Sequence, residues 1–165
     1  MNTILSALAT LVVAGMLNPT AGGAQTVNPT EAERLEQRAA SFHVRDIVKV
    51  GNALLRAASL RCDTDPIGVT DLIRAGTAYY GGGNPERARA TFVQAADRAL
   101  AMGDVVQAAD GYLRAAIIAN QQGDLERDVL IAKANRLAAS PLLSEAHRRL
   151  IVGQFKQPVE VAARH

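Results

Sequence analysis

The sequence predicts an all-α fold, and three observations support this prediction. Alanine, which has the highest helix propensity, occurs 31 times in the 165 residues. Aromatic residues make up only 4% of the chain, and the alternating patterns that are typical of strands are scarce. Glycines recur at twenty-residue intervals at Gly83, Gly103 and Gly123, which is the spacing expected of one helix and its turn.

The bulk composition indicates one domain with no special electrostatic or redox character. The 18 basic and 16 acidic side chains give a net charge of +2, so the total charge offers no argument for a nucleic-acid partner. Cys62 is the single cysteine, so no internal disulfide can form. We interpret Cys62 as a small hydrophobic residue rather than a reactive thiol.

Residues 1–24 resemble a secretory signal peptide. They carry no charged side chain and contain an apolar run from Ile4 to Leu17, which is followed by small residues up to Ala24. This run is shorter than the roughly 20 residues that span a bilayer. The resemblance implies cleavage after Ala24 and export to the periplasm or the medium. Because a basic residue is missing before the apolar run, an uncleaved membrane anchor and a misassigned start stay open as alternatives.

Residues 25–66 are expected to form an N-terminal helical segment that caps the rest of the fold. Thr30 is the predicted N-cap of its first helix, with Glu33 three residues later. Apolar residues then recur at helical spacing, and Gly51 either bends this stretch or divides it into two helices. Pro66 is expected to end the segment, because proline disfavours the helical conformation at the preceding residue.

Residues 67–153 are predicted to form helices separated by short turns. Thr70 is the expected cap of a helix that ends at the three glycines Gly81–Gly83. Asn84 and Pro85 suit the cap and the first position of the next helix. The other predicted boundaries are helix ends near Met102, Gln121 and Ala139, a last helix from Ser140–Pro141 to about Gly153, and a flexible tail over residues 154–165.

The three consecutive glycines are interpreted as a turn and not as a phosphate-binding loop. No predicted strand precedes them, and no Gly-Lys-Ser or Gly-Lys-Thr follows. Glycine also tolerates the positive φ that ends many helices.

A four-residue template accompanies the recurring glycines. A complete copy has a glycine, a small residue five positions later, an aromatic residue four positions after that, and a second small residue three positions further on. The last three positions share one helix face, and no single copy buries that face alone, so the units are expected to stack. The copies are Gly83-Ala88-Phe92-Ala95, Gly103-Ala108-Tyr112-Ala115 and the degraded Gly123-Asp128-Ala132-Asn135.

Residues 72–95 resemble a tetratricopeptide repeat. Tyr79, Ala88 and Phe92 match the pattern of that family at its spacing, whereas Leu72 stands where the family has tryptophan. A second, weaker unit follows in the sequence. The resemblance implies a short α-α superhelix of tetratricopeptide-like hairpins with N-terminal capping helices, and the alternative is an unrelated helical bundle.

The resemblance also implies a concave groove, formed mainly by the first helix of each pair, that binds a protein or peptide partner. The alternative function is self-association, in which an exposed helix face completes the stack and no peptide groove exists. The apolar groove positions are equally compatible with a core, and the polar ones with plain solvated surface. The groove positions carried over are Ile73, Thr77, Tyr80, Asp110, Leu113, Ile117 and Asn120.

The sequence offers no recognisable catalytic or metal-binding constellation. His43 and His147 lie in different predicted helices, without a partner at metal-ligand spacing. Asp63 and Asp65 share a loop with Cys62, but they supply too few oxygens for calcium. No serine lies in a Gly-x-Ser-x-Gly sequence. We therefore expect a binding scaffold with no enzymatic activity, no cofactor and no metal, and with membrane contact only through an uncleaved signal segment.

Overall fold

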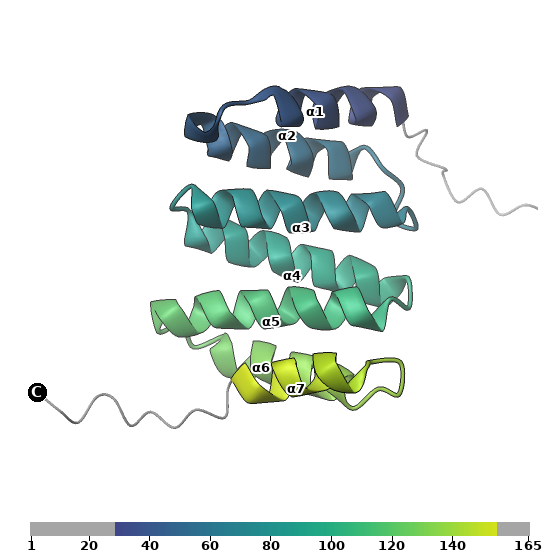
Figure 1. Ribbon diagram of the computed structural model, residues 1–165, viewed down its shortest axis with the longest axis vertical. Coiled ribbons are helices and arrows are strands. Elements are labelled where there is room, and N and C mark those ends of the chain that lie inside the picture. The colour runs from purple at the N-terminus through teal and green to yellow at the C-terminus, as the bar shows by residue number, and fades with distance from the viewer. Residues whose placement is uncertain (1–28, 155–165) are drawn as a thin grey trace, which may run out of the picture.

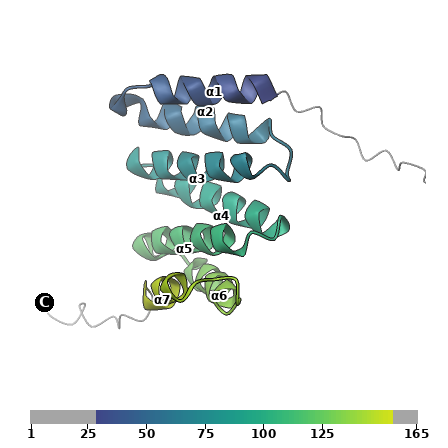
Figure 2. The same cartoon turned by 45° about the vertical axis from the view of Figure 1, so that its right-hand side comes forward.

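The computed structural model describes residues 29–154, which form a ladder of helices without a strand. Each helix packs against its neighbours in the chain, so the order from one end to the other follows the sequence (Figures 1 and 2). This arrangement confirms the predicted all-α, superhelical class. The elements are α1 (Pro29–Ser41), the 3-10 turn η1 (Val44–Asp46), α2 (Ile47–Ser59), α3 (Pro66–Gly81), α4 (Pro85–Ala101), α5 (Val105–Gln122), α6 (Arg127–Ala138) and α7 (Glu145–Gln154).

Two predicted segments lie outside the described residues. The predicted signal peptide, residues 1–24, precedes α1, and the predicted tail continues beyond Gln154, at which α7 ends.

The recurring glycines form the turns that the sequence predicts. Gly83, Gly103 and Gly123 have φ angles of +71°, +77° and +66°, a backbone region that is strained for residues with a side chain. In the first two turns the next residue caps the following helix. Asn84 and Asp104 each accept a hydrogen bond from the backbone amide three residues later, at 3.4 and 3.0 Å. The interpretation of the run Gly81–Gly83 as a turn is confirmed, because α3 ends at Gly81 and α4 begins at Pro85.

The small-aromatic-small face of the first two template copies is buried. Phe92 and Tyr112 are each only 3% exposed, and the alanines on either side of each ring are fully buried. The third copy differs, because Asp128, Ala132 and Asn135 lie on the exposed side of α6. The inward face of α6 is instead formed by Leu130, Ala134 and Ala138.

Glycines within the helices let neighbouring helices approach one another closely. A Cβ atom on Gly76 would lie 2.9 Å from the ring of Phe92, and one on Gly111 would lie 2.9 Å from the Cβ of Ala96. Contacts below about 3.4 Å between carbon atoms are repulsive, so neither position has space for a side chain. Helices α3, α4 and α5 are therefore packed around Phe92 at a separation that only glycine permits.

The buried tyrosines keep a polar partner for each hydroxyl. Tyr79 donates to Asn52 Oδ1 at 2.9 Å, and Tyr112 donates to Asp97. Burial and the neighbouring Asp97 carboxylate raise the pKa of Tyr112 to about 12. Lys133 Nζ lies 4.8 Å from the centre of the Tyr112 ring, which adds a cation–π contact between α6 and α5.

The predicted start of α3 was wrong. The helix begins at Pro66, and Asp65 caps it by accepting a hydrogen bond from the Ile67 amide at 2.9 Å. Thr70 lies inside the helix, where its hydroxyl donates to the Pro66 carbonyl at 3.4 Å. The prediction treated Pro66 only as a residue that ends a helix. Its fixed φ and missing N–H also suit the first helical position, and that preference prevails here.

Three other predicted boundaries were also wrong. Gly51 lies within α2, and the chain breaks earlier, at η1. A Cβ on Gly51 would lie 2.8 Å from the Tyr79 ring, so this glycine serves helix packing rather than a bend. Thr30 lies inside α1, which begins at Pro29. The last helix begins at Glu145, because Ser144 rather than Ser140 accepts the hydrogen bond from the amide three residues later.

Candidate functional site

Two adjoining cavities open on the side of the stack where α2, α3 and α5 meet. Their volumes are about 340 and about 200 Å³, and Thr77 and Arg114 line both of them. Because they share these residues, they form one continuous depression, which we call the groove. Its residues are Ile47, Val50 and Leu54 of α2; Ile73, Arg74, Thr77, Ala78 and Tyr80 of α3; Phe92 of α4; and Arg114, Ile117 and Ile118 of α5.

The groove combines an apolar floor with a few polar groups. Its charged lining residues are the two half-exposed arginines Arg74 and Arg114. Arg114 Nε donates to Asp110 Oδ2 at 2.7 Å, and its guanidinium group lies 5.7 Å from the centre of the Phe92 ring. The Tyr80 hydroxyl donates to Gln121 Oε1 at 2.8 Å, which joins the C-terminal ends of α3 and α5. A mostly apolar depression with a few oriented polar groups is typical of ligand sites.

The structure brings four of the seven predicted groove residues together. Ile73, Thr77, Tyr80 and Ile117 line the groove. Leu113 lies in the hydrophobic core and is only 3% exposed, so it takes the core position that was its alternative.

The two remaining predicted residues do not line either cavity. Asp110 lies at the rim, where it holds Arg114. Asn120 is exposed near the start of α6, and its Oδ1 accepts a hydrogen bond from Arg127 Nη1 at 3.5 Å.

Sequence reasoning missed one wall of the groove and both arginines. The family resemblance assigns the groove to the first helix of each pair, but the N-terminal wall is formed by Ile47, Val50 and Leu54 of α2. No local signal in the sequence distinguishes this wall, because it depends on how α1 and α2 pack. A sequence pattern could have indicated the two arginines, because Arg74 and Arg114 lie forty residues apart at equivalent places in two successive predicted helical pairs.

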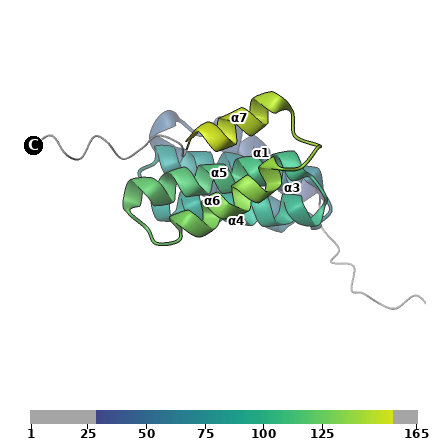
Figure 3. The same ribbon diagram turned by 90° about the horizontal axis from the view of Figure 1, so that it is seen from below.

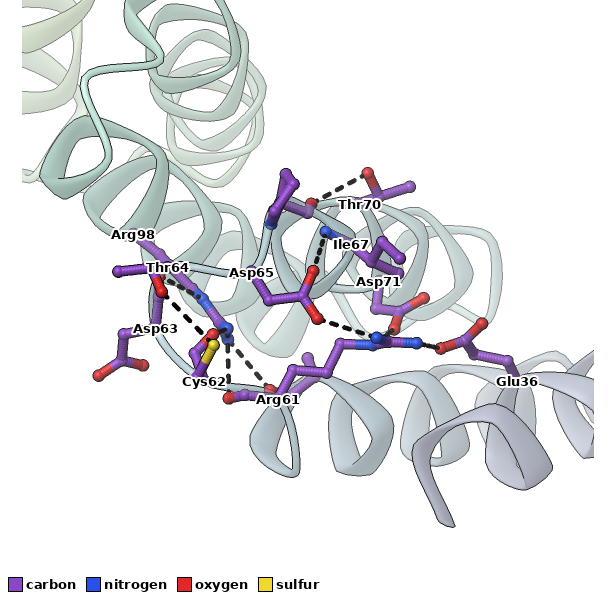
Figure 4. Close-up of polar contacts among 12 residues, drawn as sticks. Glu36, Arg61, Cys62, Asp63, Thr64, Asp65, Ile67, Thr70, Asp71 and Arg98 are labelled. Atoms are coloured by element: carbon purple, nitrogen blue, oxygen red, sulfur yellow. Dashed lines mark hydrogen bonds and ion pairs between the residues drawn. The ribbon is translucent and has the colours of Figure 1, made fainter. Parts of the chain in front are cut away.

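A buried ionic cluster adjoins the groove where the first two helical pairs meet. The side chain of Arg61, which follows α2, is 7% exposed and contacts Glu36 of α1, Asp65 at the start of α3, and Asp71 within α3 (Figure 4). The distances from Arg61 are 2.9 Å to Asp65 Oδ2 and 3.4 Å to Asp71 Oδ2. Burial disfavours the guanidinium charge, but the hydrogen bonds to Glu36 and Asp65 outweigh it and raise the pKa of Arg61.

A second arginine fastens the end of α2 to α4. Arg98 donates to the carbonyl oxygens of Ala58 at 3.0 Å and of Asp63 at 3.3 Å, and also to those of Arg61 and Cys62 (Figure 4). Arg98 thus adds donors to carbonyls at the end of α2 and in the following loop, of which those of Ala58 and Cys62 also accept from the backbone amides of Arg61 and Asp65. Gly68 makes the space, because a Cβ there would lie 2.6 Å from the guanidinium group.

Neither metal chemistry nor membrane spanning is indicated within residues 29–154. No group of three His, Cys, Asp or Glu side chains in this range is placed to hold a metal ion. None of the helices in the described part of the chain is both long and apolar enough to cross a membrane. No family model, curated protein or solved structure matches the chain. The function is therefore argued from the groove itself.

Proposed function

We propose that the protein is an exported helical-repeat scaffold that binds a peptide segment of a partner protein in the groove on α2, α3 and α5. The observation that carries this proposal is the groove, an open and largely apolar depression that extends over three helical pairs. The export part of the proposal rests on the apolar N-terminal segment that precedes the described residues.

The packing beneath the groove supports a preformed binding surface. Phe92 lies under it and is held between α3 and α5 by Gly76 and Gly111, which leave no space for the helices to move closer. A surface that does not have to be ordered on binding loses less conformational entropy when a partner docks. The exposed parts of the arginines supply hydrogen-bond donors at the rim, and the hydroxyl oxygens of Thr77 and Tyr80, which donate to Ile73 and Gln121, can accept there.

Substitution of groove residues is expected to weaken partner binding. Ile117→Asp places a charge on the apolar floor, and Tyr80→Ala removes the aromatic wall. A loss of about 2 kcal/mol, or about thirtyfold in affinity, is typical of a central interface residue. The measurement is quantitative mass spectrometry of proteins recovered by the immobilised mature chain from a cell-envelope extract of the source organism.

Asn120→Ala is the matched control for this experiment, because Asn120 is exposed on the same helix as Ile117 and does not line the groove. It is expected to recover the same partners as the unmodified protein. Circular dichroism confirms that each variant is folded. Equal recovery by all three variants would reject the groove as the binding site.

A second candidate function, self-association, is favoured by the different chemistry of the two ends of the stack. At the C-terminal end, which α6 and α7 form (Figure 3), Leu125, Val129, Leu142 and Leu150 are 52–94% exposed. The outer face of α1 at the other end exposes charged and amide side chains. Terminal units of helical stacks need a polar outer face for solubility, and the C-terminal end lacks one over these positions.

Light scattering coupled to size-exclusion chromatography tests self-association. If the C-terminal end joins two copies, the molar mass is expected to rise towards twice that of the chain as concentration increases, and Leu142→Ser with Leu150→Ser to abolish the rise. Leu100→Ser, at an exposed position on α4, is the control and is expected to leave the rise unchanged. A constant monomer mass at every concentration would exclude this candidate.

A further inference from the structure

In the ionic cluster around Arg61, the carboxylate of Glu36 on α1 and the buried carboxylate of Asp71 contact the same guanidinium group. Glu36, Asp65 and Asp71 face Arg61, and Arg74 is the second cation, half-exposed and 3.6 Å from Asp71 Oδ1. The Asp71 side chain is 1% exposed, and both of its oxygens lack a hydrogen-bond partner. A buried carboxylate without hydrogen bonds is costly, so this arrangement favours either a bound proton or a rearrangement.

The position of Glu36 identifies α1 as the element that can relieve this cost. With α1 docked, the Glu36 carboxylate repels that of Asp71. When Glu36 leaves with α1, Arg61 and Arg74 remain beside Asp71 and this repulsion disappears. Helix α1 packs mainly against α2, so its link to α3 passes through Glu36 and Arg61. A proton on Asp71 removes the same repulsion without undocking, because it leaves Glu36 and Asp65 as the charged carboxylates.

We propose that Glu36, Arg61 and Asp71 form a pH-sensitive latch that holds α1 against α3 in acidic solution and loosens as the pH rises to neutral. In the closed latch, neutral Asp71 donates a hydrogen bond towards Glu36, and Arg61 pairs with Glu36 and Asp65. Arg98 of α4 adds a positive charge that helps to lower the pKa of Asp65, and its donors are used by carbonyl oxygens at the end of α2 and in the loop that follows.

The pKa of Asp71 sets the direction and the range of the switch. Burial, reinforced by repulsion from Glu36, raises this pKa to about 6, against the attraction of Arg61 and Arg74. The docked state therefore binds a proton that the hydrated carboxyl, with its ordinary pKa of about 4, releases. Docking therefore weakens as the pH rises from about 4 to about 6, and this contribution is constant above that range.

The latch acts on α1, the helix that packs against the N-terminal wall of the groove. Helix α1 lies on α2, and α2 contributes Ile47, Val50 and Leu54 to that wall. The latch itself does not depend on the proposed peptide-binding function, because it is defined by the cluster alone.

Hydrogen–deuterium exchange of the full chain tests the latch at about pH 5 and about pH 7.5, with rates corrected for intrinsic exchange. The readout is the protection of residues 29–41 relative to residues 105–122 of α5. With the pKa values given above, the equilibrium constant for docking of α1 is expected to be about tenfold smaller at pH 7.5 than at pH 5. Unchanged relative protection of α1 would overturn the proposal.

Two variants isolate the groups responsible. Asp71→Asn stays neutral at every pH and is expected to make the relative protection of α1 independent of pH. Glu36→Gln removes the repulsion but not the burial of Asp71, so it is expected to reduce the pH dependence. Asp128→Asn, which changes an exposed carboxylate paired with Arg127, is expected to retain the tenfold dependence. If Asp71→Asn does not fold, Glu36→Gln decides the question. Retention of the full pH dependence in a folded Asp71→Asn or Glu36→Gln variant would refute the latch.

Discussion

Phe92→Ala is expected to lower the free energy of unfolding by about 3–5 kcal/mol, the range for truncation of a buried aromatic residue. The ring is 3% exposed and fills the space between α3, α4 and α5. The surrounding helices cannot close on the cavity easily, because Gly111 already brings α5 within contact of the backbone carbonyl of Phe92. The lost transfer free energy and the remaining cavity therefore add to one another.

Urea unfolding followed by far-ultraviolet circular dichroism measures this loss. Leu100→Ala is the matched control, since Leu100 is a large apolar residue on the same helix that is 43% exposed, and it is expected to cost less than about 1 kcal/mol. A loss below about 1 kcal/mol for Phe92→Ala would mean that the ring is not a core residue and would remove the support for the packing beneath the groove.

Arg61→Met is expected to be the second strongly destabilising substitution, with a loss of about 3–5 kcal/mol near neutral pH. Methionine keeps much of the volume of the arginine stem but removes the guanidinium group that Glu36, Asp65 and Asp71 share. Removal of one member of a buried ion pair leaves the others uncompensated in a medium that solvates them poorly. The loss is expected to shrink in acid, because protonation neutralises the carboxylates that remain.

The controls for Arg61→Met separate buried from exposed charge. Arg149→Met removes an arginine whose side chain is 79% exposed and which pairs with Glu145 at 3.0 Å, and it is expected to cost less than about 1 kcal/mol. Addition of Glu36→Gln and Asp71→Asn to Arg61→Met is expected to recover much of the lost stability, because no unpaired charge then remains between those residues. Equal losses for Arg61→Met and Arg149→Met in urea titrations would contradict the assignment of a buried cluster.

Two of the errors in the predicted helix boundaries occurred where the local sequence permits two outcomes. Pro66 can end one helix or begin the next, and Gly51 can interrupt a helix or lie within it. Asp65 caps α3 through the Ile67 amide, and Gly51 is occupied from outside by the Tyr79 ring. The first outcome depends on the competition between two nearby caps, and the second depends on a side chain that is distant in the chain.

Part of the groove could be predicted from the sequence. Ile73, Thr77, Tyr80 and Ile117 were predicted from the layout that the tetratricopeptide resemblance implies, in which residues three or four apart on the first helix of a pair share one face. Leu113 has the same periodicity but lies in the core, because neighbouring helices cover its face of α5. Periodicity identifies a face, whereas the packing partner decides whether that face is buried or open.

The sequence by itself determined the all-helical class, the turns at the three recurring glycines, and the burial of Phe92 and Tyr112 between small residues. These features follow from backbone preferences and from periodicities that operate over a few residues. Only the tertiary structure decided that α2 forms a wall of the groove and that Arg61 meets a carboxylate 25 residues earlier in the chain. Such contacts depend on how whole helices pack against one another, and no short stretch of sequence carries that information.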